Sequence, residues 1–163
     1  MAGAVQAFHA VRALPYFSGA DRTPLAALRA GRGACTAKHL VLRDLLRLIG
    51  LHADVALVEC DFAAGVPAHA TMPPDLRAQA GTGGVRDMHC WVHLHQNGAP
   101  LRLDATWPDA LGAFGFPVNS DWAGTGDTRP AAEGGVVRAV CENILERKAE
   151  LLAELSAAET ARR

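Results

Sequence analysis

The sequence predicts an α+β fold in which a central helix packs on an antiparallel β-sheet and an amphipathic helix follows at the C-terminus. Residues 35–49 form an apolar segment directly after a glycine-flanked turn, and a helix that is apolar on most sides is normally central to its domain. Alternating apolar runs on both sides of Asn97-Gly98 predict a β-hairpin. Apolar residues at helical spacing over 136–158 predict the last helix.

Size and composition favour a single globular domain. The chain has 163 residues, half of them hydrophobic and a fifth charged, with a net charge of −1, which is ordinary for a soluble domain. It has no block of Lys and Arg, so we expect no nucleic-acid partner. It has no apolar run of about 20 residues, so we expect no membrane span. The start has no basic segment ahead of its apolar residues, which argues against a signal peptide and favours a cytoplasmic location.

The N-terminal third reads as two helices ahead of the central one. Residues 5–14 have weak amphipathic spacing, and Pro15 ends the pattern because the residue before proline leaves the α region. Residues 21–24 (Asp-Arg-Thr-Pro) read as a turn or cap that starts a short helix over 25–30. Gly31 and Gly33 then break the chain.

The central helix is predicted over 35–49, with Gly50 just past its end. Its polar face is assigned to four residues: Lys38, Arg43, Asp44 and Arg47. Residues 51–62 alternate and predict a strand. Residues 63–86 form a loop-rich excursion with a short helical patch at 75–79, and loops of this length often serve as lids or walls of a site. Residues 108–135 are rich in Gly, Pro, Asn and Asp, which predicts irregular structure.

The hairpin pairs residues 88–95 with 100–106. If Asn97 and Gly98 are the central turn residues, His93 faces Arg102 and Trp91 faces Asp104. Alternation then puts one set of side chains on a common face: His89, Trp91, His93, His95, Arg102 and Asp104. Asp104 lies diagonal to both His89 and His93, with backbone separations of roughly 7–8 Å, so a carboxylate–imidazole hydrogen bond is expected. The geometry does not decide whether His89 or His93 makes this bond.

Cys35 has the sequence context of a nucleophile. It starts a helix, whose N-terminal amides and partial positive charge lower a thiol pKa. A cysteine nucleophile needs an imidazole within reach and a third group to orient that imidazole. The other cysteines, Cys60, Cys90 and Cys141, form no CxxC pair and are expected to be small buried hydrophobes without disulfides.

Three segments resemble the transglutaminase-like superfamily of papain-like cysteine enzymes: GRGACTAKHLVLRDLLRLIGLHADV, MHCWVHL and LRLDATWP. The motif blocks span roughly residues 30–108, and GFPVNSDWAGTGDT is similar to the segment after the Asp in some bacterial members. The resemblance implies a papain-like fold with Cys35 as nucleophile, His89 as base and Asp104 as orienting acid. It thereby selects His89 over His93.

The resemblance also implies an oxyanion donor upstream of the cysteine, usually a Trp or Gln side chain acting with the cysteine backbone N–H. The chain has no upstream Trp, and the candidates are Gln6, His9 and Tyr16. Four further residues are candidates for the pocket: His39, Trp91, His93 and Trp122. Each has a structural alternative, as a packing residue on the helix, strand or loop that carries it.

These features predict a cysteine acyl-transfer enzyme that acts on a peptide, protein or small amide through a thioester, by hydrolysis or amide exchange. Protease or amidase chemistry is favoured over protein cross-linking, and no cofactor and no metal are expected. Residues 1–135 would form the catalytic domain, and 136–163 a helix packed on it or extending from it. One alternative is a zinc site from the strand histidines with Cys35 and His39. The other is a non-catalytic scaffold that forms a homo-oligomer through the last helix.

Overall fold

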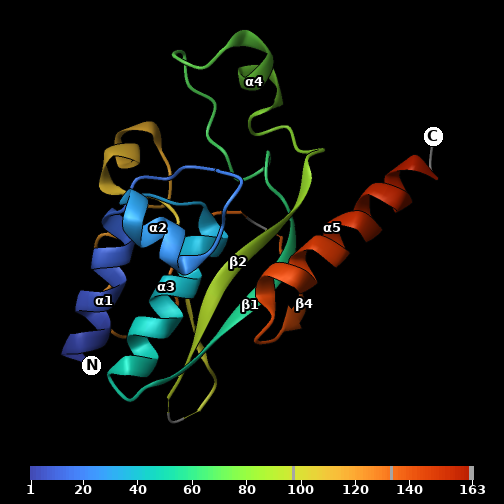
Figure 1. Ribbon diagram of the computed structural model, residues 1–163. Coiled ribbons are helices and arrows are strands. Elements are labelled where there is room, and N and C mark those ends of the chain that lie inside the picture. The colour runs from blue at the N-terminus through green and yellow to red at the C-terminus, as the bar shows by residue number, and fades with distance from the viewer. Residues whose placement is uncertain (97, 133, 162–163) are drawn as a thin grey trace.

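The computed structural model describes residues 1–96, 98–132 and 134–161 of the protein (Figure 1). It is an α+β fold, as predicted. The helices are α1 (Ala2–Ala13), α2 (Pro24–Ala30), α3 (Cys35–Leu48), α4 (Pro74–Gln79) and α5 (Ile144–Thr160), with a 3-10 helix η1 (Asp109–Phe114). The strands are β1 (His52–Asp61), β2 (Arg86–His95), β3 (Leu101–Leu103) and β4 (Val136–Val140).

The strands form one antiparallel sheet in the order β3-β2-β1-β4. The hairpin register is confirmed, because His93 pairs with Arg102 and its neighbours on each strand pair in step. The turn that set this register includes Asn97, which lies outside the described residues. The correct register places Asp104 on the His89 face of the sheet.

The main core lies between the sheet and its helices. Inward residues of β1 and β2 share one buried cluster with residues of α3 and α5, so both helices cover the same face of the sheet. Figure 1 shows α1 and α2 gathered around α3, on the outer side of this layer. The opposite face carries a smaller cluster of Ala56, Val58 and Trp91, over which the chain near Gly135 lies.

The helix boundaries follow the local chemistry. Thr23 caps α2 by accepting the Ala26 N–H on Oγ1 at 3.2 Å, and Pro24 occupies the first turn, where its missing N–H costs nothing. Gly31 ends α2 with φ of 61°, a left-handed conformation that glycine adopts without strain. These features confirm the predicted turn and cap at 21–24.

The predicted helix over 136–158 was wrong at its start. Residues 136–140 form β4 against the free edge of β1, and α5 begins only at Ile144. The segment Val-Val-Arg-Ala-Val is rich in β-branched residues, which favour strands, and its apolar spacing fits either period. The apolar stripe of α5, which led to the homo-oligomer hypothesis, is buried against the protein's own sheet.

The predicted strand over 100–106 is shorter, because β3 ends at Leu103. The Asp104 N–H donates to Thr128 Oγ1 at 2.7 Å, and the Ala105 N–H donates to His39 Nε2 at 2.8 Å. These amides therefore bond to a loop and to α3 instead of to β2, which takes Asp104 out of the ladder.

The assignment of Lys38 to the polar face of the central helix was wrong. Lys38 is fully buried, and its Nζ donates to the carbonyl oxygens of Arg12, Leu14 and Thr106 at 3.1, 2.7 and 2.7 Å. The ammonium thus ties the end of α1 and the segment after β3 to α3. In the described part of the chain, no helix is long and apolar enough to cross a membrane.

Candidate active site

Cys35 is the first residue of α3, and the chain before it is held in place. The Gly33 N–H donates to the Pro15 carbonyl and the Phe17 N–H donates to the Gly33 carbonyl, both at 3.1 Å. A Cβ on Gly33 would meet the Ala37 Cβ at 3.3 Å and crowd a second alanine on α2, so the close approach requires glycine. Cys35 itself is 6% exposed.

His89 on β2 meets Asp104 just beyond β3. Their side chains are fully buried, and His89 Nε2 lies 2.8 Å from Asp104 Oδ2. The same carboxylate accepts the Ala131 N–H at 2.7 Å, the Thr106 hydroxyl at 2.6 Å and the Thr106 N–H at 3.1 Å. Because an ionised carboxylate only accepts, the His89 Nε2 carries the proton.

Because Nε2 is bound to Asp104, Nδ1 is the ring nitrogen of His89 that is left for another partner. Nδ1 is buried and has no hydrogen-bond partner among the described residues. Burial alone would lower the pKa of His89, but the Asp104 carboxylate and the neighbouring Cys35 raise it to about 10. Burial likewise opposes ionisation of Asp104, yet the charge and hydrogen bond of His89 bring the pKa of that carboxyl to about 2. Both groups therefore favour their charged forms.

The Cys35 thiol is set apart from the other three. Interaction with the Cys90 thiol, the charge of Lys148 and the proximity of His89 hold the pKa of Cys35 well below its usual value, in spite of burial. Burial raises the pKa of Cys60 to about 12 and also raises that of Cys141, and interaction with Cys35 raises the pKa of Cys90. Only Cys35 thus has the character of a nucleophilic thiolate.

His39 lies next to this pair as a neutral ring. Its Nδ1–H donates to the Cys35 carbonyl at 2.8 Å, and its Nε2 accepts the Ala105 N–H at 2.8 Å. Since Nε2 accepts, it carries no proton, and its 3.6 Å approach to Asp104 Oδ1 is not an ion pair. Burial lowers the pKa of His39 to about 4. His39 therefore joins the first turn of α3 to the backbone next to Asp104, and its role as a pocket residue stays a prediction.

Lys148 of α5 is a residue that the sequence reasoning missed. It is 4% exposed, and its Nζ lies 3.9 Å from Cys35 Sγ and 3.0 Å from Thr36 Oγ1. Burial alone would lower the pKa of Lys148, but the neighbouring Cys35 raises it above its ordinary value. The sequence did carry a signal, because Lys148 is the one charged residue on the α5 stripe that otherwise consists of Ile144, Leu151 and Leu155.

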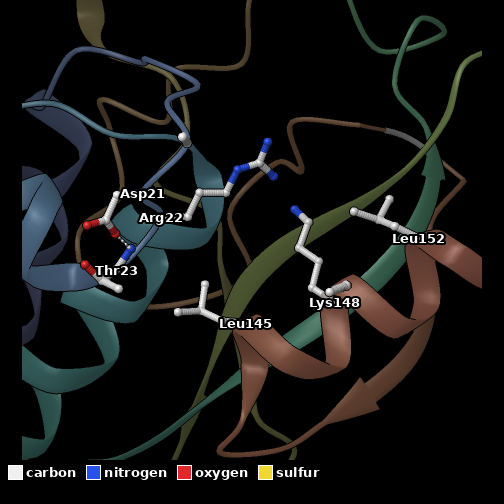
Figure 2. Close-up of a pocket in the computed structure, with 8 residues that line it drawn as sticks. Asp21, Arg22, Thr23, Leu145, Lys148 and Leu152 are labelled. Atoms are coloured by element: carbon white, nitrogen blue, oxygen red, sulfur yellow. Dashed lines mark hydrogen bonds between the residues drawn. The ribbon is translucent and has the colours of Figure 1, made fainter.

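A cavity of about 350 Å³ opens beside Lys148, between α5 and the loop before α2. Figure 2 shows Arg22 and Lys148 extending from opposite walls toward the same space. Arg22 and Lys148 therefore place two positive charges on this side of the candidate site.

A second cavity, of about 320 Å³, is apolar and is walled by the loop between β1 and β2. Tyr16, Phe62 and Trp107 line it together with residues of the segment 63–86, the loop predicted to form a lid or wall. The Phe62 ring lies 6.4 Å from the His89 ring, centroid to centroid. Burial and then the proximity of Cys35 raise the pKa of Tyr16. The apolar cavity therefore adjoins the Cys35–His89 pair.

Trp91 and His93 lie on the same face of β2 as His89 but do not hydrogen-bond to Asp104. The Trp91 ring is 6.3 Å from the His89 ring, and its Nε1–H donates to His93 Nε2 at 3.0 Å. Trp91 also belongs to the small second core. Asp104 hydrogen-bonds to His89 and not to His93.

The remaining candidates lie elsewhere. Gln6 is exposed on α1, and His9 contacts the Trp122 carbonyl at 2.9 Å. Trp122 packs against Phe8 of α1 at 4.8 Å between ring centroids. Trp122 therefore anchors the loop 108–135 to the helical layer and does not reach the Cys35–His89 pair. Among the oxyanion candidates, Tyr16 is the one whose backbone pairs with the chain just before Cys35, at Gly33.

The irregular loop also supplies two supports that were not predicted. Asn119 has a positive φ of 51°, and its Nδ2 donates to the Asp104 carbonyl at 3.1 Å. Thr128 holds the Asp104 N–H from the same loop. The loop therefore fixes the backbone of Asp104 through the side chains of Asn119 and Thr128.

The strand histidines do not converge as the alternative zinc hypothesis required. His89, His93 and His95 bond to Asp104, Trp91 and Asp54 respectively. Within residues 1–96, 98–132 and 134–161, the one cluster with metal-ligand spacing is His52, Asp54 and His95. Comparison with known proteins identified no relative: no family model, no curated protein and no solved structure matches the chain.

Proposed function

We propose that the protein is a cysteine-nucleophile acyl-transfer enzyme that acts through Cys35, His89 and Asp104. The observation that carries the proposal is the orientation of His89. Its Nε2–H is bound by Asp104, its Nδ1 has no hydrogen-bond partner among the described residues, and the pKa of the neighbouring Cys35 thiol is lowered. A nucleophile, a base and a group that orients the base are the parts such chemistry needs. The motif resemblance to transglutaminase-like enzymes assigns the same three roles.

In the first half of the reaction, the Cys35 thiolate attacks the carbonyl carbon of an amide or ester. The His89 imidazolium then gives its Nδ1 proton to the leaving amine or alcohol as the carbon–nitrogen or carbon–oxygen bond breaks. The product is a thioester on Cys35 and a neutral His89, whose Nε2–H is still held by Asp104.

In the second half, water or an amine attacks the thioester. Neutral His89 takes the proton from this nucleophile at Nδ1, and the carbon–sulfur bond breaks to restore the thiolate and the imidazolium. Hydrolysis yields an acid, and amine attack yields a new amide. Lys148 stabilises the free thiolate in each cycle from 3.9 Å.

The oxyanion of each tetrahedral intermediate needs donors. Ala34 precedes α3 and provides no side-chain cap, which leaves the Cys35 N–H at the positive end of the helix as one donor. The Tyr16 hydroxyl is the second donor that we propose, since Tyr16 pairs with Gly33, two residues before Cys35, and lines the apolar cavity. The apolar cavity beside His89 then suits a hydrophobic acyl side chain.

Alkylation of the full chain across pH tests the nucleophile. Iodoacetamide labelling, followed by mass spectrometry of each cysteine peptide, should give a Cys35 rate that is nearly constant between pH 6 and 8. A thiol with an ordinary pKa gains about tenfold in thiolate for each pH unit over this range. Cys60, Cys90 and Cys141 serve as internal controls because their pKa values are raised.

A panel of chromogenic esters and anilides tests the reaction. Wild type should hydrolyse some members with an acyl-enzyme burst, and Cys35→Ala should remove both the burst and the turnover. The proposal fails if Cys35 gains rate with pH like a free thiol and Cys35→Ala keeps the hydrolytic activity of the wild type.

A further inference from the structure

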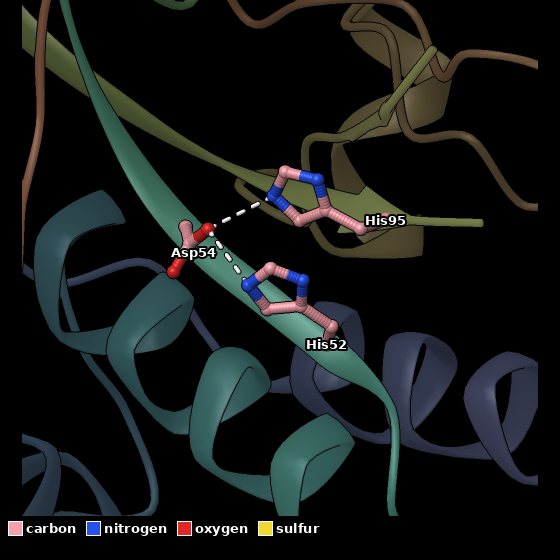
Figure 3. A group of neighbouring side chains, drawn as sticks. All are labelled: His52, Asp54 and His95. Carbon is pink, nitrogen blue, oxygen red and sulfur yellow. Dashed lines mark hydrogen bonds and ion pairs between the residues drawn. The ribbon is translucent and has the colours of Figure 1, made fainter. Parts of the chain in front are cut away.

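We propose that His52, Asp54 and His95 form a binding site for a divalent transition metal of the zinc class. His52 and His95 are direct cross-strand partners at the start of β1 and the end of β2. Asp54 is two residues beyond His52, so its side chain lies on the same face of the sheet. Figure 3 shows both imidazole rings turned toward the Asp54 carboxylate.

The spacing of the three ligand atoms matches what zinc requires. Asp54 Oδ2 lies 2.9 Å from His95 Nε2 and 3.4 Å from His52 Nε2, and all three ligand atoms lie within 4.8 Å of one another. Tetrahedral zinc with bonds of about 2.0–2.1 Å separates its ligand atoms by roughly 3.3–3.4 Å. The two separations from Asp54 therefore differ from this spacing by about half an ångström or less, and the separation between the two histidine nitrogens differs by at most about 1.5 Å.

The ring arrangement keeps both imidazoles on one side of the carboxylate. The two rings stack with centroids 4.2 Å apart and planes 17° from parallel. Each ring presents Nε2 to the same oxygen, so loss of the two Nε2 protons would leave two lone pairs and one carboxylate oxygen facing a common point. Two histidines and one carboxylate are a familiar protein set for zinc, with a fourth position left for water.

The surroundings orient the carboxylate and leave one oxygen for the metal. Arg47 Nη2 donates to Asp54 Oδ1 at 2.8 Å, and Arg47 Nε donates to the Ala53 carbonyl at 2.7 Å. Glu142 pairs with Arg47 at 2.6 Å and so offsets its positive charge. A hydrogen-bonded outer partner of this kind fixes a ligand and tunes its basicity.

The site is open to solvent and separate from Cys35. The side chains of His52, Asp54 and His95 are 70%, 23% and 34% exposed, which leaves room for a metal ion to enter. His95 lies at the far end of β2 from His89, at roughly 20 Å along the strand. Metal bound here would tie the first residue of β1 to the last residue of β2 and stabilise the sheet. The metal site does not depend on the proposed acyl-transfer function.

Zinc chloride titration against a chromophoric chelator tests the site, with the full chain carrying Cys35→Ala so that the Cys35 thiol cannot bind the metal. One equivalent should bind, and His52→Ala, His95→Ala and Asp54→Asn should each weaken binding at least tenfold. His69→Ala is the matched control, because His69 lies in the loop between β1 and β2 and its side chain hydrogen-bonds only to Thr71 among the described residues. It should leave the affinity unchanged.

Cobalt(II) provides a second readout that does not need tight binding. Its visible spectrum should report nitrogen and oxygen ligands, without the near-ultraviolet charge-transfer band of a thiolate, and should be lost in His52→Ala/His95→Ala. Circular dichroism confirms that each variant is folded. The proposal is overturned if the double variant binds zinc with wild-type affinity, if the cobalt spectrum shows thiolate ligation, or if zinc binds more weakly than millimolar.

Discussion

Lys148 Nζ lies 3.9 Å from Cys35 Sγ, so the C-terminal helix delivers a cation to the thiol that starts the central helix. Both groups are buried, and a charge pair away from water interacts far more strongly than one on the surface. Residues 136–163 were expected to form a helix packed on the catalytic domain or extending from it. The helix of this segment, α5, packs on the sheet, and through Lys148 it is part of the candidate site.

Lys148→Met should raise the pKa of Cys35. Methionine keeps most of the side-chain length and packing but removes the charge, and an opposite charge at this distance shifts a pKa by about 1–3 units. The pH profile of Cys35 alkylation in the full chain measures the change, as a midpoint that moves upward.

Lys148→Arg restores the charge and should restore most of the low midpoint. Arg147→Met removes a neighbouring charge that pairs with Glu150 at the surface, and it should leave the midpoint in place. An unchanged midpoint in Lys148→Met would show that the lysine is only structural.

The two buried histidines should titrate at opposite ends of the pH scale. His39 should remain neutral down to about pH 4, because burial disfavours its charged form. His89 should remain protonated up to about pH 10, because Asp104 and Cys35 outweigh burial. Nitrogen-15 NMR of histidine side chains measures both, and Cys35→Ala should lower the His89 pKa while leaving the His39 ring neutral.

These pKa shifts give a pH dependence of stability with a definite sign. Between pH 4 and 6.5 the unfolded chain protonates His39 and the folded chain does not, so His39 makes the protein less stable as pH falls through this window. Between pH 6.5 and 10 the folded chain holds a proton on His89 that the unfolded chain has lost, so the contribution of His89 falls as pH rises. Urea unfolding of wild type and His39→Gln should differ mainly in the acidic window.

The sequence predicted the parts of the site that local patterns encode. The Asn-Gly turn implied the register that puts Asp104 diagonal to His89, and the glycine turn implied the helix that starts at Cys35. Neither pattern could choose between His89 and His93, since both are diagonal to Asp104. In the structure, Asp104 hydrogen-bonds to His89. The carboxylate lies just beyond the end of β3, where Thr106 and Ala131 fix its position.

The residues that sequence reasoning missed depend on contacts between distant elements. Lys38 and Lys148 are both lysines on helices, where a solvent-exposed position is the ordinary expectation. Lys38 is buried because three carbonyls from α1 and the segment after β3 converge on it, and Lys148 because α5 packs beside Cys35. β4 was missed because the free edge of β1 is a tertiary feature, and such edges override a helical pattern in a short β-branched segment.

Lys38→Met should be strongly destabilising, by about 3 kcal/mol or more. The apolar replacement fills the space but leaves the buried carbonyl oxygens of Arg12 and Thr106 and the partly buried carbonyl oxygen of Leu14 without their donor. Each unsatisfied buried group costs on the order of 1–3 kcal/mol. Urea unfolding followed by circular dichroism measures the loss. Arg29→Met on the exposed face of α2 is the control and should stay within about 0.5 kcal/mol of wild type.

Ala80→Trp should close the apolar cavity and change substrate preference without removing the nucleophile. Ala80 lines the cavity and is 7% exposed, so an indole there takes the space that we assign to the acyl chain. In wild type, each methylene buried in the cavity is worth about 0.8 kcal/mol, or roughly fourfold in kcat/KM. A p-nitrophenyl hexanoate, which is longer than the acetate by four methylenes, should then exceed it by roughly two orders of magnitude.

In Ala80→Trp this preference should collapse toward unity, while the pH profile of Cys35 alkylation stays the same. Ala78→Trp places the same side chain two residues earlier, on the exposed surface of α4, and should retain the wild-type preference. If Ala80→Trp keeps the hexanoate preference, the acyl chain does not enter this cavity. Substrate recognition would then belong to the other side of the thiol, where Arg22 and Lys148 face each other.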